Sequence, residues 1–132
     1  MKQMKSEINR QYVNQNFYGN MEGEVFSHCY FRNCRFDNVS FRGCQFDHCT
    51  FKNVMMIVTD VSGAYFNFCI FQNADMIKSN FETSVIKNCR FDSVRSYQNR
   101  TSELRIFLDN GSINDWINYE KKIQGILSAD SI

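Results

Sequence analysis

The sequence predicts an all-β solenoid of short extended segments that turn after every fifth residue, followed by an α-helical C-terminal segment. The first observation is a period of five in phenylalanine, which begins at Phe26. The second is that the residue two positions before each later slot is small or β-branched. The third is that this period ends after Arg95 and gives way to helical hydrophobic spacing.

The slots of this period are large and apolar in fourteen consecutive units, and all six cysteines lie at the small position two residues earlier. Such a period fits neither a helix nor a long alternating strand, although residues i−2 and i share one side of an extended segment. The chain must therefore coil, and each turn buries its apolar side only against neighbouring turns. The predicted core contains Phe26, Phe31, Phe36, Phe41, Phe46, Phe51, Phe66, Phe71, Phe81, Phe91, Cys29, Cys49, Cys69 and Cys89.

The units CRFDN, VSFRG, CQFDH and CTFKN resemble those of the pentapeptide repeat family, and the resemblance extends over residues 26–95. It implies a right-handed quadrilateral parallel β-helix with four units per coil, in which the central Phe and the small residue point inward. Residues twenty apart would then be stacked, which gives about 3.5 to 4 coils. We expect an N-terminal tail and cap at 1–18, the repeat β-helix at 19–96, and C-terminal helices at 97–132.

The dense cysteines and histidines between His28 and Cys49 do not predict a metal or disulfide site. Four of the cysteines are twenty residues apart and form a column, but their side chains run parallel into the core rather than toward one another. Zinc requires four ligands around one point, and His28 and His48 lie in an outward class of positions. We therefore expect buried structural cysteines, no metal and no cofactor.

The charges of the repeat region are nearly balanced. The whole chain has 15 Lys and Arg against 14 Asp and Glu, and residues 26–95 contain six acidic and eight basic residues. The resemblance implies that some relatives, the quinolone-resistance proteins among them, act on DNA gyrase, in part by imitating a DNA duplex. A duplex carries one negative charge per ~1.7 Å, so imitation requires a strongly acidic surface. We expect neither duplex imitation nor direct binding of nucleic acid.

Apolar residues interrupt the polar outward positions in two places. Met55, Ile57 and Val58 are adjacent, and Ile77 lies one coil beyond Ile57; Phe68 and Ile70 form a second group at another corner. Contiguous exposed apolar surface usually marks an interaction site. Two interpretations are open: the termini of the protein cover these residues, or the residues bind a protein partner.

The segment after Arg95 predicts two helices. Thr101 or Ser102 would begin the first, and Ser112 with Asp115 three residues later forms a capping pattern for the second, which would reach about Leu127. Its apolar residues cover roughly half of the helical circumference, which is wider than a cap requires. We favour a helix that caps the solenoid and pairs with a second copy, as in relatives that dimerise through C-terminal helices, over a cap alone. The residues concerned are Ile113, Trp116, Ile117, Tyr119, Ile123, Ile126 and Leu127.

No catalytic or nucleotide-binding motif is present, and Asp47 and His48 point outward without a cleft or a nucleophile. We expect a non-catalytic protein-interaction module of bacterial or phage type, a rigid β-helical rod that docks onto a larger protein. The alternatives are a modulator or inhibitor of DNA gyrase or topoisomerase, and a bacterial effector scaffold. The start of the chain is polar and no 18-residue apolar run occurs, so we expect a cytoplasmic protein that does not contact a membrane.

Overall fold

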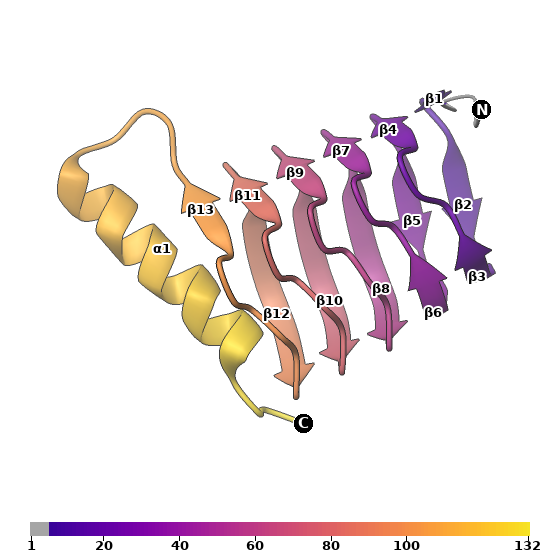
Figure 1. Ribbon diagram of the computed structural model, residues 1–132. Helices are drawn as coiled ribbons and strands as arrows, with labels where there is room; N and C mark the ends of the chain where they lie inside the picture. Colours follow the sequence, from indigo (N-terminus) through magenta and orange to yellow (C-terminus); the bar gives the residue numbers. More distant parts are fainter. Residues whose placement is uncertain (1–5) are drawn as a thin grey trace.

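The computed structural model describes residues 6–132 and shows a parallel β-solenoid of about five turns followed by a single helix (Figure 1). One sheet contains, in spatial order, β1 (Ser6–Ile8), β4 (Val25–Ser27), β7 (Gln45–Asp47), β9 (Tyr65–Asn67), β11 (Val85–Lys87) and β13 (Arg105–Phe107). The other contains β12 (Arg90–Tyr97), β10 (Ile70–Ile77), β8 (Thr50–Ile57), β5 (Tyr30–Arg32) and β2 (Gln11–Val13), with β3 (Asn16–Asn20) and β6 (Arg35–Ser40) beside them. The solenoid class is confirmed, and the predicted 3.5 to 4 coils are too few.

Stacked residues are twenty positions apart, as the period of five requires. Phe46 pairs with Phe26 on one side and with Phe66 on the other, and Ile57 pairs with Ile77. The long strands β8, β10 and β12 each continue around a corner, so the second sheet forms two walls of the coil. The remaining wall consists of turns joined by single bridges between Ser40, Asp60, Asn80 and Arg100.

The core is a set of parallel columns of side chains. The ring of Phe46 stacks on Phe26 and Phe66 with centroid distances of 5.0 and 4.9 Å, and both pairs have an interplanar angle of 5°. Rings of adjacent walls meet edge to face, as Phe46 and Phe51 do at 5.5 Å. All fourteen predicted core residues are at most 4% exposed, so their side chains lie inside the solenoid.

The first coil begins earlier than expected. Residues 6–18, predicted to be part of a tail and cap, include β1, β2 and most of β3, and they pair with β4, β5 and β6. Residues 1–5 of the predicted tail lie outside the described residues. This coil is one residue short, because Tyr12 pairs with Phe31 and the register shifts between Phe17 and Gly19. The five-residue register that begins at Phe26 therefore does not include this first coil.

The C-terminal segment contains one helix rather than two. Residues 105–107 form β13, which pairs with β11, and Thr101 and Ser102 lie in the last turn of the solenoid instead of at a helix start. The inward slots of this coil are filled by polar Ser96 and Thr101, so the apolar period ends although the backbone continues to coil. The helix α1 (Ile113–Ser128) begins with the capping box of Ser112 and Asp115, as predicted.

The helix closes the C-terminal end of the solenoid (Figure 1). Ile123 and Leu127 are buried against the last coil. The indole Nε1 of Trp116 donates to the carbonyl of Ile106 at 3.2 Å, and the hydroxyl of Tyr119 accepts from the backbone N–H of Cys89 at 2.7 Å. Burial raises the pKa of Tyr119, so its phenol stays neutral. The helix thus covers the end of the core and satisfies polar backbone groups there.

We predict that Phe46→Ala lowers the free energy of unfolding by about 3–5 kcal/mol, because it opens a cavity between two stacked rings. Arg42→Ala serves as the control, since its side chain is 63% exposed and its ion pair with Asp60 is 3.9 Å long; the expected change is within about 0.5 kcal/mol. Urea denaturation followed by circular dichroism measures both. Equal losses in the two variants would contradict the inward assignment of Phe46.

Candidate interaction surfaces

The outer walls of the solenoid are polar, and many of their charges are paired locally. Arg95 forms two hydrogen bonds of 2.9 Å to Asp75 one coil below, and Arg90 lies 3.2 Å from Asp92. Lys87 reaches Asp109 at 3.3 Å. Pairs of this kind are exposed and weak, but they leave no wall of the described residues with a large charge of one sign. Charge is therefore a poor guide to a docking face.

The apolar residues Met55, Ile57, Val58 and Ile77, which we call the central patch, lie together on the wall formed by the second halves of β8 and β10. Ile57 is the direct register neighbour of Ile77, and Met55 neighbours Asp75. Val58 is 50% exposed at the adjoining corner, and the other three side chains are half-buried. The half-buried Tyr97 continues the column above Ile77, and its twenty-residue spacing from Ile77 is the sequence signal for that position.

The described C-terminal residues do not cover this patch. The backbone N–H of Ser131 donates to the carbonyl of Ser96 at 2.8 Å, and the N–H of Gln98 donates to Asp130 at 2.9 Å. Both contacts lie one coil above Ile77, at the level of Ser96 and Gln98. Val58 keeps its exposure, so the explanation that the chain ends shield it does not apply within residues 6–132.

The backbone at Val58 is unusual for a β-branched residue. Its φ is 48°, in the left-handed region, whereas the corners of this kind at Asn33, Asn53 and Asn73 have φ of 53°, 53° and 51°. Asparagine tolerates this region, but a valine Cβ approaches the carbonyl oxygen too closely there. An exposed valine at such a corner lowers stability without filling the core, which favours a role for its side chain outside the solenoid.

Phe68 and Ile70 belong to a separate corner, between β9 and β10. Phe68 is 46% exposed, and its ring stacks on His48, which in turn stacks on His28, with centroid distances of 5.0 and 4.9 Å. The outward placement of both histidines is as predicted, and their twenty-residue spacing, continued by Phe68, was a signal for this stack. One face of the Phe68 ring is therefore covered by a contact within the protein, and the rest of the side chain remains exposed.

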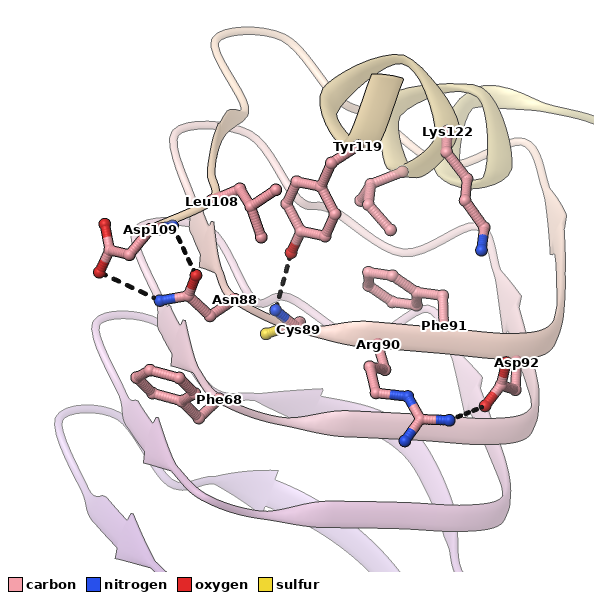
Figure 2. Close-up of a pocket in the computed structure, with 11 residues that line it drawn as sticks. Phe68, Asn88, Cys89, Arg90, Phe91, Asp92, Leu108, Asp109, Tyr119 and Lys122 are labelled. Atoms are coloured by element: carbon pink, nitrogen blue, oxygen red, sulfur yellow. Dashed lines mark hydrogen bonds and ion pairs between the residues drawn. The ribbon is translucent and has the colours of Figure 1, made fainter. Parts of the chain in front are cut away.

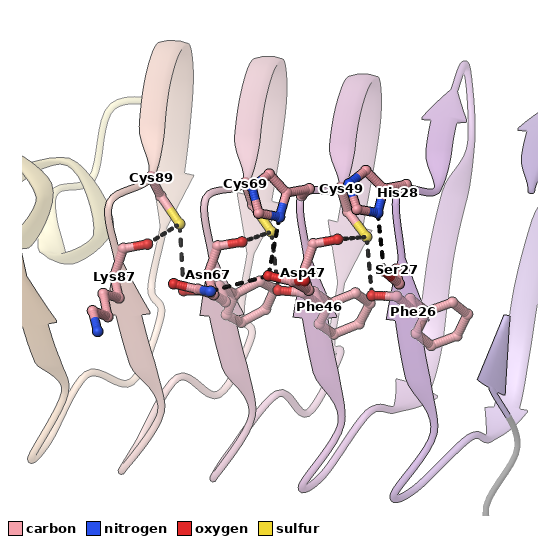
Figure 3. A network of polar contacts seen from close by, with 12 residues as sticks. Phe26, Ser27, His28, Phe46, Asp47, Cys49, Asn67, Cys69, Lys87 and Cys89 are labelled. Atoms are coloured by element: carbon pink, nitrogen blue, oxygen red, sulfur yellow. Dashed lines mark hydrogen bonds and ion pairs between the residues drawn. The ribbon is translucent and has the colours of Figure 1, made fainter. Parts of the chain in front are cut away.

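The polar groups around this stack do not form a catalytic arrangement. Nδ1 of His48 lies 3.1 Å from Asp47, whose carboxylate also accepts from Asn67 at 3.0 Å; Nδ1 of His28 lies 3.0 Å from the hydroxyl of Ser27 (Figure 3). Ser27, Asp47 and Asn67 line a shallow hollow of about 350 Å³ on this wall, but neither His28 nor His48 borders it. The hydroxyl of Ser27 lies beside His28, but among the described residues no carboxylate contacts that imidazole.

A hollow of about 400 Å³ lies between the last coil and α1 (Figure 2). Tyr119 and Lys122 border it from the helix, and Phe68 and Arg90 border it from the solenoid. The Tyr119 hydroxyl is bonded to the backbone of Cys89, and Arg90 is held by Asp92 at 3.2 Å. These groups are occupied by structural contacts and do not converge on a common point.

Comparison with known families gives a match to the model of the pentapeptide repeat region over residues 25–97, which is more than half of the 132 residues. The chain belongs to the pentapeptide repeat family. The match spans β4 to the end of β12, and it leaves out the short first coil and the capping helix. No curated protein sequence is significantly similar to this family member.

Among solved structures, this pentapeptide repeat protein is similar to Rfr23 from the cyanobacterium Cyanothece 51142, with 11% identity, a TM-score of 0.44, and coverage of 72% of this chain and 90% of Rfr23. HetL from Nostoc sp. strain PCC 7120, involved in regulation of heterocyst differentiation, shares 15% identity at a TM-score of 0.42; 69% of this chain matches 39% of HetL. QnrB1, a plasmid-mediated fluoroquinolone resistance protein, shares 13% identity at a TM-score of 0.32, over 77% and 70% of the two chains. These values are too low to carry an argument about function.

The helix of this pentapeptide repeat protein uses most of its apolar arc as a cap. Five of the seven predicted residues are buried or half-buried on the solenoid side, namely Trp116, Tyr119, Ile123, Ile126 and Leu127. Ile113 and Ile117 are 63% and 39% exposed.

Within residues 6–132, no three His, Cys, Asp or Glu side chains cluster around one point, and no helix is long and apolar enough to span a bilayer.

We predict that Val58→Asn raises the free energy of unfolding by about 1 kcal/mol, because asparagine relieves the strain of the left-handed corner. Lys78→Asn is the matched control, since Lys78 has φ of 49° in the same column but is not β-branched; its gain should be smaller. Chemical denaturation of the three proteins gives the comparison. A less stable Val58→Asn protein would show that the valine contributes to the fold itself.

Proposed function

We propose that the protein is a non-catalytic interaction module, a rigid rod that docks onto a larger protein through the central patch. The observation that carries the proposal is Val58, an exposed β-branched side chain at a strained corner next to Ile57 and Ile77. Apolar surface of this kind is desolvated when a partner covers it, and aliphatic anchors of this type supply the centre of an interface.

The rod is well suited to this role, since its strands pair between neighbouring coils and its outward side chains are stacked in columns. A preorganised surface loses little conformational entropy on binding. The paired charges around the patch, Arg95 with Asp75 and Arg35 with Asp37 at 3.6 Å, would form a polar rim. The mechanism is steric occupation of a site on the partner.

We predict that Ile57→Asp weakens partner binding while leaving the fold intact, because it places a charge at the centre of the interface. Gln72→Asp is the matched control: Gln72 is exposed at the equivalent outward position of the preceding wall. Affinity capture from the native host, followed by titration with the captured protein, should show a loss of about tenfold or more for Ile57→Asp alone. Equal binding by both variants would refute the central patch as the docking site.

Imitation of a DNA duplex is not proposed. Residues 26–95 have more basic than acidic residues, eight against six, and the acidic ones are spread over all four walls. The gyrase and effector-scaffold alternatives rest on family resemblance, not on a feature of this surface. A supercoiling assay with purified gyrase distinguishes them: inhibition or drug protection at sub-micromolar protein would favour gyrase as the partner of the rod.

We also propose that two copies associate through the outer face of α1. Ile113 and Ile117 remain exposed there, and a shallow hollow of about 440 Å³ beside Ile117 is lined by Gly125 and Ser128. In a twofold pair, Ile117 of each copy would enter the hollow of the other. Such a contact would join two rods end to end and leave both central patches accessible.

Light scattering tests the association, and we predict a dimer for the intact chain and a monomer for Ile117→Asp, because the substitution buries an unpaired charge in a symmetric contact. Asn118→Asp adds the same charge beside this face and is the control, since Asn118 is also exposed on the helix. A monomeric intact chain, or a dimeric Ile117→Asp protein, would exclude this interface.

A further inference from the structure

Four of the six cysteines, Cys29, Cys49, Cys69 and Cys89, form a straight column inside the solenoid. Figure 3 shows the last three of them. Each thiol lies 3.3–3.6 Å from two carbonyl oxygens, one two residues before it and one in the coil below. Because these contacts repeat in every coil, all four side chains have the same orientation. Their sulfur atoms therefore repeat at the strand spacing of about 4.8 Å.

This spacing is unsuitable for zinc and for a disulfide. Zinc takes four ligands around one point, and the column offers two sulfurs on one line. A disulfide needs sulfur atoms about 2.05 Å apart, so each pair would have to close by more than half of its separation.

The same spacing suits an ion that takes two ligands in a straight line. A zinc–thiolate bond is about 2.3 Å long, and two collinear bonds of about that length span about 4.6 Å, close to the spacing of the sulfur atoms. Soft ions such as Cu(I) select thiolate ligands, and Cu(I) and Ag(I) readily adopt linear two-coordinate geometry. We infer that neighbouring thiols of this column form linear binding sites for a soft monovalent ion, Cu(I) or Ag(I).

The surroundings favour such an ion in a neutral unit. Cys49, Cys69 and the Phe rings beside them are at most 1% exposed, and an unbalanced charge in this core would be costly. One thiol proton leaves to solvent when one monovalent ion enters, so one thiolate, one thiol and one cation remain and the charge stays zero.

The other two cysteines provide an internal comparison. Cys34 has the same pair of carbonyl contacts, at 3.3 and 3.4 Å, but Val54 follows it in its column. Cys44 is followed by Ala64. Neither has a stacked thiol, so neither can complete a linear site. Hydroxyl side chains are accommodated at this position, because Thr59 makes the same two carbonyl contacts at 3.1 and 3.2 Å, and Cys→Ser variants are therefore expected to fold.

The number of retained ions tests the inference. The reduced full-length protein is incubated with Ag⁺ in chloride-free buffer, long enough for buried sites to open, and then washed with excess glutathione to remove singly bound ions. Native mass spectrometry counts the silver, and far-ultraviolet circular dichroism checks the fold. The column holds two sites that share no sulfur, Cys29 with Cys49 and Cys69 with Cys89, so the wild-type protein should retain two ions.

The variants give distinct expected counts. Cys34→Ser/Cys44→Ser should still retain two ions, Cys69→Ser one, Cys49→Ser one, and Cys49→Ser/Cys69→Ser none, because no stacked pair remains in the last protein. X-ray absorption should find two sulfur neighbours at about 2.3 Å. A folded wild-type protein without silver, a double Cys49→Ser/Cys69→Ser variant that retains the wild-type number, or uptake only with loss of the β signal would each overturn the inference.

Discussion

Stacking of phenylalanine rings at the spacing of neighbouring strands is the interaction on which the rest of this molecule depends. Phe31, Phe51, Phe71 and Phe91 stack at 4.8 to 4.9 Å, a separation that parallel strand pairing and ring contact both prefer. A slip of one residue would turn each of these rings toward solvent. The rings therefore determine the register between coils, and the register determines every column of side chains on the outside and the inside.

The columns explain where chemistry is concentrated in this protein. Inward columns bring like groups together without water, as in the four thiols, and outward columns bring like groups together in water, as in His28, His48 and Phe68. The central patch is a column of the same kind, with Ile57 below Ile77 and Tyr97 above. A single apolar side chain becomes part of a continuous patch only because a similar side chain follows twenty residues later and stacks on it.

The two ends of the solenoid differ in how they are closed. At the C-terminal end α1 buries Ile123 and Leu127 and supplies partners for the last coil from Trp116 and Tyr119. At the other end Glu7 occupies an inward slot of the first coil and pairs with Arg10 at 3.2 Å. Charged groups there limit the apolar surface that an open solenoid end would otherwise present.

The extent of the coil was predicted only where one register holds. The deletion near Gly19 shifts the inward slots of Tyr12 and Phe17 by one position, and the polar slots Ser96 and Thr101 conceal the coil that ends at β13. The stretch that leads to Ile106 was read as a helix because its local pattern allows one, whereas pairing with β11 makes it a strand. The capping box of α1, a purely local signal, was predicted correctly. The roles of the central patch and of Ile113 and Ile117 stay predictions.

The sequence by itself determined the class of fold, the inward and outward positions, and the twenty-residue columns, because a strict period leaves one way to bury its apolar residues. Only the tertiary structure decided which apolar residues are covered by contacts within the protein and which remain exposed. It placed Trp116 and Tyr119 on the last coil, stacked Phe68 on His48, and left Val58 exposed at a strained corner. The physical reason is that burial by the cap and stacking at a corner depend on where distant segments meet, which a repeat pattern does not specify.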